Sequence, residues 1–404
     1  MRKIIATGSD GFSNMIKQGS PSMFVVPLSF SLLFIALISK DIVFGISVSW
    51  IAICVNLFTV ALIFVVGSLS SRVIWKHQKK IMELYFLMFL TQIIGLSGNV
   101  DAQSFIYMAQ IFLIFCYISY MTNIDFSNIS IKVFNIFYTI LCIISLLEYL
   151  VYHGNLWSKY MESGNNISGI YVFLTCINIA FVIMKKSQLK MLILPLMLVL
   201  PLMNTNSRTA IICALIIGIC YLLLTVFRVR KYTSILLFFT VIIAVFGIVY
   251  LYPRIYLWSG YAELDAWSLE HFGKHILNTR DAIWMNTIDV VGGNWLFGLG
   301  TGLLNRDVMY YQGSSHNQYI QLYLQNGIVG LMLLFALFYT LWKTLSKHME
   351  DNTVRFCLAC FLGIIIFNCF ETTLLQNKLV SGIIQWHLIS IGVSRSLFIE
   401  EANA

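Results

Sequence analysis

The sequence predicts an all-α integral membrane protein with about twelve transmembrane helices and one long extracytoplasmic loop that contains short helices. Of its 404 residues, 59% are hydrophobic and only 11% are charged, and the mean hydropathy is +0.82. A soluble globular domain carries about 25% charged residues, so an ordinary soluble fold is excluded. Apolar runs of about 20 residues recur along the chain, which is the length of a membrane-spanning helix and about twice that of a barrel strand.

Hydropathy in windows of about 19 residues places the individual spans. They are expected at 22–39, 43–66, 81–99, 102–121, 132–152, 167–184, 190–204, 209–226, 232–252, 318–342, 356–374 and 379–397. The span at 190–204 is the shortest and contains Pro195 and Pro201, which would kink or break a helix. Eleven or thirteen spans are therefore alternatives. We expect residues 1–404 to form a single polytopic membrane domain, within which 253–317 is the one long loop.

The basic residues lie in short clusters between the apolar runs, where they set the orientation of the helices. The net charge is +8, but this placement argues against nucleic acid as a partner and for the lipid bilayer. With the N-terminus inside, 18 Lys and Arg residues fall on the cytoplasmic side and 8 fall outside. This bias follows the positive-inside rule. It predicts that both termini are cytoplasmic and that the loop 253–317 faces outward.

All nine cysteines fall within predicted spans, so they are expected to be packing residues rather than disulfides or metal ligands. Cys357 and Cys360 have the spacing of a redox motif. No histidine or further cysteine accompanies them at the spacing of a metal site, and the packing interpretation is preferred.

The outward face carries eight basic residues, and those in its turn and loop are mostly arginines. Five of them lie in the outward turn 204–208 and in the loop: Arg208, Arg254, Lys274, Arg280 and Arg306. A guanidinium can bind phosphate through two parallel hydrogen bonds, and Ser207 adds a hydroxyl beside Arg208. The pattern predicts a phosphate-bearing ligand on this face. For any single arginine, the alternative is that its side chain reaches the lipid headgroups.

The first half of the loop has the spacing of an amphipathic helix on the outer membrane surface. The residues at intervals of three and four are Trp258, Tyr261, Leu264, Trp267 and His271. His271 and His275 share a helical face. A zinc site would need a further ligand close by, so histidines on the polar face or lining a substrate are preferred, and a zinc pair is the alternative. The glycines between 292 and 302 indicate tight backbone, without the ending of a P-loop.

No metal or other cofactor is expected. The outward face has no Asp-x-Asp pair, and its acidic residues are scattered through several loops, whereas a hard cation needs several oxygen ligands that converge on one point. Asp281 directly follows Arg280. We expect it to pair with the guanidinium and to orient it.

Three blocks of residues resemble a known family. They are Asn206-Ser207-Arg208-Thr209-Ala210, Arg280-Asp281-Ala282-Ile283-Trp284 followed by Gly298-Leu299-Gly300, and His316-Asn317 with Gly327-Ile328-Val329-Gly330. In order, spacing and outward placement they are similar to the O-antigen ligase/polymerase family of bacterial membrane glycosyltransferases. The resemblance covers residues 206–330, and the other helices agree with it only in number and hydropathy.

The resemblance implies a metal-independent, inverting glycosyltransferase at the outer face of the bacterial inner membrane. Its donor would be an oligosaccharide linked to undecaprenyl pyrophosphate. A polymerase would join this donor to another lipid-linked repeat unit, with a chain-length regulator protein as a partner, and a ligase would transfer the polymer to lipid A-core. The context Ser314-Ser315-His316-Asn317-Gln318 favours the polymerase narrowly, and the ligase is the alternative.

The residues also support this chemistry on their own. Transfer from a sugar pyrophosphate needs a base for the acceptor hydroxyl and fixed positive charge for the leaving group. We predict His316 as the base, since histidine accepts protons near neutral pH, and Arg208 and Arg280 as the catalytic cations. A helix cap is the alternative for His316. Gly327 and Gly330 are expected to let its helix pack closely against a neighbour.

Five further residues are predicted to bind substrate: Arg306, Arg254, Asn317, Ser207 and Trp284. In ligases a further arginine lies between the tryptophan block and the histidine. Arg306 occupies that interval, although its surroundings match the family poorly.

A secondary transporter or flippase is the competing class of protein. It would show repeated halves and ionisable residues near the middle of the membrane. The acidic residues in the predicted spans are Glu83, Glu148 and Glu371, all near span ends, and His387 is the other ionisable residue well inside a span. No internal repeat is visible, so the transferase is preferred.

Overall fold

A computed structural model of the chain describes most of the predicted spans and most of the long loop. The described residues are 22–38, 42–43, 46–47, 51–61, 74–96, 102–127, 132–147, 150–151, 164–185, 207–227, 231–308, 314–376 and 379–403. Within them the chain is almost wholly helical, apart from a short hairpin in which β1 (Ile42–Val43) pairs antiparallel with β2 (Ile46–Ser47). The predicted span at 190–204 lies outside the described residues.

The long helices overlap the predicted apolar runs. They are α2 (Ser22–Ile38), the helix Ile51–Ala61, α4 (Ile74–Gly95), α5 (Ala102–Met121), α6 (Lys132–Leu147), α8 (Gly164–Lys185), α11 (Arg208–Val226), α12 (Lys231–Leu251), α16 (Gln318–Leu345), α17 (Asn352–Phe367) and α18 (Leu379–Ala402). In the described part of the chain, 6 helices are long and apolar enough to cross a bilayer. The helical fold class is confirmed for this part of the chain, and these candidate spans support a multi-pass membrane protein. The total of twelve spans stays a prediction.

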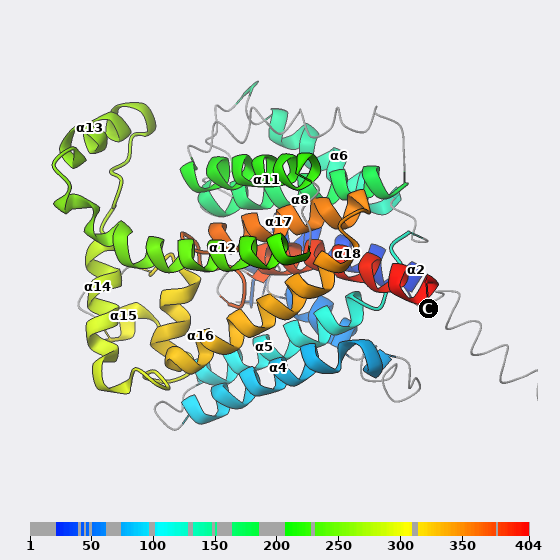
Figure 1. Cartoon of the computed structure of the whole chain (residues 1–404), viewed down its shortest axis with the longest axis horizontal. Coiled ribbons are helices and arrows are strands. Elements are labelled where there is room, and N and C mark those ends of the chain that lie inside the picture. The colour runs from blue at the N-terminus through cyan, green and yellow to red at the C-terminus, as the bar shows by residue number, and fades with distance from the viewer. Residues whose placement is uncertain are drawn as a thin grey trace, which may run out of the picture.

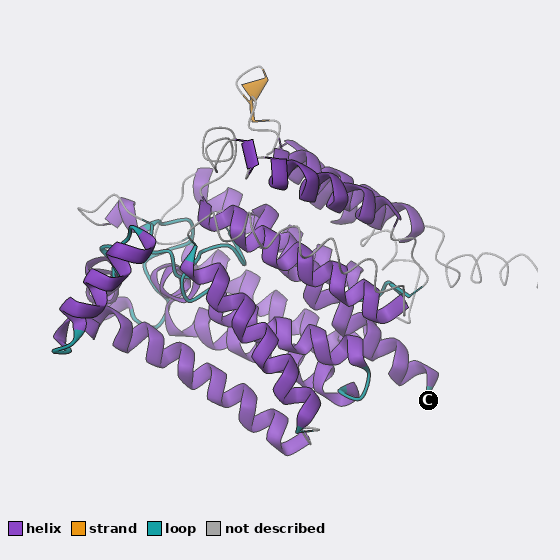
Figure 2. Ribbon diagram, turned by 90° about the horizontal axis from the view of Figure 1, so that it is seen from above, coloured by secondary structure: helices purple, strands orange, loops and turns teal. Residues whose placement is uncertain are grey.

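The helices α17 and α18 form the centre of the bundle. Figure 1 shows them with α8 and α11 on one side and with α16, α4 and α5 on the other, and Figure 2 shows the same bundle from above. Nearly every side chain of α17 is buried. By contrast, α11 and α12 expose large apolar side chains such as Leu222 and Ile243, which are 62% and 69% accessible. Exposed residues of this kind on an apolar helix fit a surface that faces lipid.

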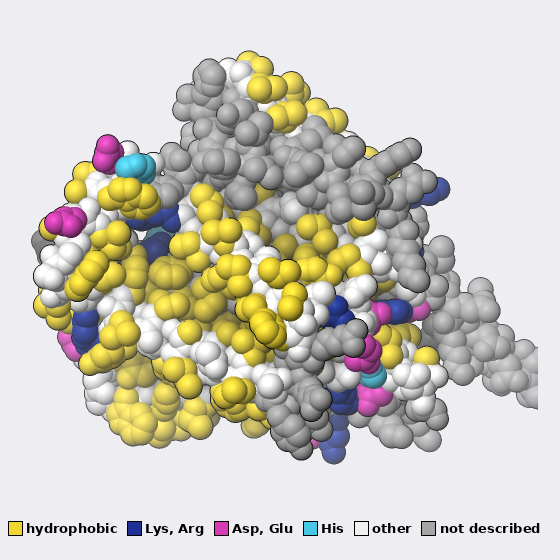
Figure 3. All heavy atoms as spheres, turned by 45° about the horizontal axis from the view of Figure 1, so that its top comes forward, with side chains coloured by type: hydrophobic (Ala, Val, Ile, Leu, Met, Phe, Trp, Pro, Cys, Tyr) yellow, Lys and Arg dark blue, Asp and Glu magenta, His cyan; other side chains and the backbone are white. Residues whose placement is uncertain are grey.

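Charge is confined to the ends of the bundle. Figure 3 shows apolar side chains over most of the visible face, and Lys and Arg side chains gathered toward its two ends. All nine cysteine thiols are free. Seven are buried, in agreement with their predicted role in packing, whereas Cys220 is half-buried and Cys54 is exposed. Polar side chains inside the bundle pair with one another, as where the Tyr117 hydroxyl lies 2.8 Å from Nδ1 of His387.

The segment 252–308 folds into short helices at one end of the bundle (Figure 1). They are η3 (Tyr252–Leu257), α13 (Tyr261–Phe272), α14 (Arg280–Val291), η4 (Gly292–Asn294) and α15 (Asn305–Val308). A further short helix, η5 (Ser346–His348), follows α16. The expected helix with Leu264 and Trp267 on its exposed side is present as α13. That this end of the bundle faces outward stays a prediction.

Gly327 interrupts α16, where its backbone takes φ 60° and ψ −157°. Four backbone hydrogen bonds join the interrupted turn to the glycine-rich loop before α15, at N···O distances of 2.8 to 3.3 Å: Leu299 to Leu324, Gly300 to Gln325, Ile328 to Trp295 and Val329 to Leu296. A Cβ at Gly327 would lie 2.4 Å from the Leu296 carbonyl oxygen. Gly327 therefore lets the helix pack closely against a neighbour, as expected, and that neighbour is this loop.

Candidate active site

The three residues predicted to carry the chemistry lie at or beside the N-termini of three helices. Arg208 is the first residue of α11, Arg280 is the first residue of α14, and His316 directly precedes Asn317, the N-cap of α16. The unpaired backbone N–H groups and the dipole at a helix N-terminus favour a bound anion. The fold thus places both arginines where the backbone adds to their positive potential.

Arg208 is fixed by α13 and by the turn that follows it. Its Nη1 donates to Oγ of Ser268 at 2.6 Å, and its Nη2 donates to the carbonyl oxygen of His275 at 2.9 Å. Ser268 Oγ in turn donates to the carbonyl oxygen of Lys274 at 2.8 Å. Ser207 is buried and caps α11, accepting a hydrogen bond from Ala210 N. The two hydrogen bonds from the guanidinium lock its orientation before any ligand arrives.

Asp265 holds the turn that carries these partners of Arg208. Its Oδ1 accepts from the backbone N–H of Ile276 at 2.7 Å, and its Oδ2 lies 2.7 Å from Nδ1 of His275. The Ile276 hydrogen bond first, and the His275 ring second, lower the pKa of the Asp265 carboxyl. Both bonds favour its charged form. At neutral pH the carboxylate therefore fastens the turn to α13.

The two loop histidines have separate partners. His275 faces Asp265, whereas His271 Nδ1 lies 2.9 Å from the Trp267 carbonyl oxygen and its ring stacks on the Trp267 indole at 4.7 Å. Among the described residues, no group of three His, Cys, Asp or Glu side chains could hold a metal ion. The zinc-pair alternative gains no support, and the preferred interpretation of these histidines as polar-face or substrate-lining residues stays a prediction.

Arg280 is held by the end of α17. Its Nη2 donates to the Phe370 carbonyl oxygen at 3.3 Å, and its guanidinium carbon lies 5.8 Å from the centre of the Phe370 ring. The two residues before it, Asn278 and Thr279, have φ of 48° and 67°. The predicted ion pair with Asp281 is wrong: across the described residues the guanidinium is oriented by Phe370, and no ion pair joins it to that carboxylate.

Lys274 completes a group of three cations with Arg208 and Arg280, which we call the cationic cluster. Burial lowers the pKa of Lys274, and the charges of Arg208 and then Arg280 lower it further, while the charge of Glu371 opposes them. The three cations therefore act on one another directly. Figure 3 shows Lys and Arg side chains in a recess beside α13. The sequence placed Lys274 on the outward face, but gave no reason to separate it from the other basic residues.

His316 is presented by a strained backbone. Its φ is 44°, and Asn278, Thr279 and His316 are the non-glycine residues with positive φ in the described chain. Such conformations cost about 1–3 kcal/mol each and gather at functional sites. All three adjoin or carry a predicted catalytic side chain. The helix-cap alternative for His316 is wrong, because Asn317 caps α16: its side-chain oxygen accepts hydrogen bonds from the backbone N–H groups of Tyr319 and Ile320.

The imidazole of His316 faces a buried carboxylate. Its Nδ1 lies 3.5 Å from Oε2 of Glu371, and the side chains of His316 and Glu371 are 48% and 4% exposed. The sequence placed Glu371 near the outer end of a span without assigning it a role. A single acidic residue at the end of a span does not indicate a catalytic role. Only the fold brings Glu371 beside the histidine, which is 55 positions away in the sequence.

Residues 191–335 match the family model described as O-antigen ligase. This segment contains all three blocks that carried the resemblance. The match supports the assignment of this segment to the O-antigen ligase/polymerase family. A search of curated proteins found no match to the chain.

Three of the predicted substrate-binding residues are buried. Trp284 is fully buried, and its Nε1 donates to the Ser315 carbonyl oxygen at 2.7 Å. Asn317 is also fully buried as the cap of α16, and Ser207 is 1% exposed as the cap of α11. Their contact with substrate stays a prediction, to which this burial gives little support. Their hydrogen bonds instead join the backbone beside His316 and at the start of α11, next to Arg208.

The other two predicted substrate-binding residues have partners away from the cationic cluster. Arg254 donates from Nη1 to the Tyr250 carbonyl oxygen at 2.7 Å, and its guanidinium lies 4.1 Å from the centre of the Tyr250 ring. Arg306 is 60% exposed at its side chain and lies 3.6 Å from Asp307. Both stay predictions as substrate ligands, with less geometric support than Lys274.

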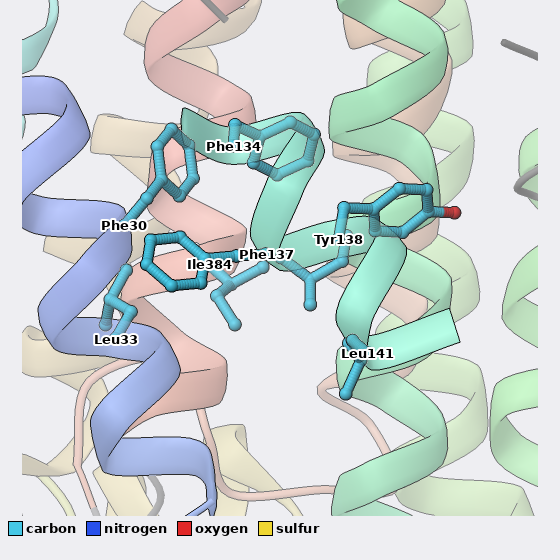
Figure 4. Close-up of a pocket in the computed structure, with 8 residues that line it drawn as sticks. Phe30, Leu33, Phe134, Phe137, Tyr138, Leu141 and Ile384 are labelled. Atoms are coloured by element: carbon cyan, nitrogen blue, oxygen red, sulfur yellow. The ribbon is translucent and has the colours of Figure 1, made fainter. Parts of the chain in front are cut away.

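A separate pocket lies within the bundle, between α2, α6, α8 and α18. Figure 4 shows apolar side chains such as Phe30, Phe134 and Ile384 directed into it. The polar atom in its lining, the Tyr138 hydroxyl, lies 3.0 Å from Thr175 Oγ1. A lining without a charged group cannot neutralise a pyrophosphate. The recess beside α13, which holds Lys and Arg side chains, is therefore the better candidate for the active site.

Proposed function

We propose that the protein transfers glycan from undecaprenyl pyrophosphate to a sugar hydroxyl at the outer face of the cytoplasmic membrane. The observation that carries this proposal is the juxtaposition of a half-exposed histidine with the cationic cluster, inside a segment of the O-antigen ligase family. The family supports a glycosyltransferase-like enzyme. The donor, the side of the membrane and the inverting mechanism belong to the proposal.

The proposed reaction uses these groups in two ways. The acceptor hydroxyl attacks the anomeric carbon of the donor while His316 takes its proton, and the bond from that carbon to the pyrophosphate oxygen breaks. One glycosidic bond forms, and undecaprenyl pyrophosphate leaves with the bonding electrons. The cationic cluster neutralises the charge that develops on the leaving group. Because this positive charge is fixed in advance, a divalent ion is not required.

Polymerase and ligase share this chemistry and differ in the acceptor. The sequence around His316 favours an O-antigen or surface polysaccharide polymerase, for which a chain-length regulator protein is a proposed partner. The ligase would require lipid A-core as the acceptor. Arg306, which occupies the interval of the further ligase arginine, is exposed and paired with Asp307, and this favours neither acceptor.

Release of undecaprenyl pyrophosphate tests the proposed function. Purified protein in liposomes is supplied with lipid-linked glycan extracted from the source bacterium, with or without purified lipid A-core. A polymerase releases undecaprenyl pyrophosphate from the lipid-linked glycan alone, and a ligase releases it only when lipid A-core is added. Movement of the glycan across the bilayer without any release would identify a flippase and refute the proposal.

The structure offers the transporter alternative little support. His387, the ionisable residue inside α18, is fully buried between the Phe30 and Phe126 rings, at 4.5 and 5.4 Å, and faces the Tyr117 hydroxyl. A proton or substrate path would need ionisable groups that reach a water-filled cavity. Enclosure by aromatic rings fits a structural role for His387.

A further inference from the structure

We propose that Glu371 is a positioning residue that fixes the ring orientation and proton arrangement of His316. This inference rests on the proposed function, in which His316 is the base. Glu371 lies in the short segment that follows α17, beside Phe370, whose carbonyl oxygen accepts the hydrogen bond from Arg280. The segment that follows α17 thus contacts both the proposed base, His316, and one of the proposed cations, Arg280.

The geometry gives the carboxylate a defined partner. Oε2 of Glu371 lies 3.5 Å from Nδ1 of His316, which is long for a hydrogen bond. Contacts of this type often shorten only when substrate binds. An ionised carboxylate can only accept, so the ring must present Nδ1–H to it. The lone pair of the neutral ring is then on Nε2, the opposite nitrogen, which is free to accept a proton from the acceptor hydroxyl.

Burial makes this carboxylate unusual. Its side chain is 4% exposed, and its second oxygen, Oε1, has no hydrogen-bond partner among the described residues. A buried carboxylate costs free energy unless nearby charge compensates it. Lys274 acts on Glu371 electrostatically, and Arg280 binds the adjacent Phe370. The carboxylate therefore faces the imidazole within the electrostatic reach of Lys274, and it can also stabilise the imidazolium that forms during transfer.

This position makes opposite predictions for turnover and for donor binding. Replacing Glu371 by glutamine keeps the side-chain volume but removes the negative charge and the requirement for Nδ1–H. Turnover should fall about 10²-fold, as expected when a catalytic group is misplaced or mispolarised. The affinity for a pyrophosphate lipid should be unchanged or higher, because a negative charge near Lys274 and Arg280 is lost. A residue with only a structural role would weaken both.

The experiment compares Glu371→Gln with Glu270→Gln, a matched change at an exposed position of α13. Turnover is measured with the extracted lipid-linked glycan, and binding is measured with sugar-free undecaprenyl pyrophosphate. Thermal unfolding in detergent is followed for each variant. We expect Glu371→Gln to lose about 10²-fold in kcat while it binds at least as tightly as the wild type. Glu270→Gln should match the wild type in all three measurements.

A parallel His316→Ala variant separates this inference from the proposed function. If His316→Ala is inactive and Glu371→Gln has wild-type kcat, the role of Glu371 is refuted and that of His316 survives. If Glu371→Gln loses binding and thermal stability together with turnover, its role is structural and the inference is also refuted. If His316→Ala has wild-type kcat, His316 is not the base of the proposed reaction, and the inference about Glu371 is refuted as well.

Discussion

Replacing Trp284 by phenylalanine tests whether this buried side chain positions His316. Its indole Nε1 donates a hydrogen bond of 2.7 Å to the Ser315 carbonyl oxygen, in a cluster with Tyr252 and Phe370 at ring distances of 5.4 and 6.5 Å. Phenylalanine keeps an aromatic ring but leaves a buried carbonyl without its donor, which costs about 1–3 kcal/mol. Because Ser315 immediately precedes His316, the base should shift as well, and a shift of about 1 Å can cost ~10²-fold in rate.

Turnover and thermal unfolding of the purified Trp284→Phe variant are measured together. We expect a lower unfolding temperature and a fall in kcat of about 10- to 100-fold, with little change in the binding of undecaprenyl pyrophosphate. Trp267→Phe is the matched control, because that indole is 50% exposed on α13. A destabilised Trp284→Phe variant with wild-type kcat would show that the tryptophan supports the fold without positioning the base.

The remaining predictions concern the cations, the kinked helix and the loop. Arg280→Lys should lose about 10- to 100-fold in transfer activity, because an ammonium cannot reproduce the two-pronged contact of a guanidinium. Arg306→Lys is the control and should lose little activity. Equal losses in the two variants would contradict this prediction. Gly327→Ala should unfold at a lower temperature than the wild type, since the positive φ of Gly327 and the nearby Leu296 carbonyl oxygen leave no room for a Cβ. Gly293 has open space around it, so Gly293→Ala should unfold at the wild-type temperature. Asp265→Asn should lower activity about 10-fold at pH 7. The pKa of Asp265 is lowered in the folded protein. The stabilisation that this carboxylate gives is therefore complete above about pH 4 and is lost as the pH falls further. In acid, the wild type and Asp265→Asn should become equally stable. Transfer should persist in excess EDTA and fall with rising salt, and magnesium-dependent recovery after EDTA would refute the arginine mechanism.

The sequence was sufficient to predict the fold class and the residues at three helix starts. Apolar run length depends on the thickness of the bilayer, which is why the described long helices overlap the runs that hydropathy placed. Arg208, Arg280 and His316 could be selected because each occurs in a recognisable block of neighbouring residues. Their assignment as a group needed the family resemblance, which the match over residues 191–335 confirms.

The partners of these residues could not be predicted, because they are distant in the sequence. Arg208 is held by Ser268, which is 60 residues away, and Arg280 by Phe370, which is 90 residues away. Asp281 was the nearest acidic residue to Arg280 in sequence, yet consecutive residues on a helix point in different directions. The burial of Trp284 could not be predicted either. A tryptophan between two predicted spans can bind a sugar or support the backbone, and the sequence does not distinguish the two roles.

Transfer by the His316→Ala variant tests the central claim most directly. The variant and the wild type are reconstituted side by side, and the release of undecaprenyl pyrophosphate from lipid-linked glycan is measured together with the binding of sugar-free undecaprenyl pyrophosphate. We predict that release falls by about 10²- to 10⁴-fold, while binding to the cationic cluster stays within about twofold, since the histidine does not belong to that cluster. Wild-type release by His316→Ala would contradict the assignment of His316 as the base.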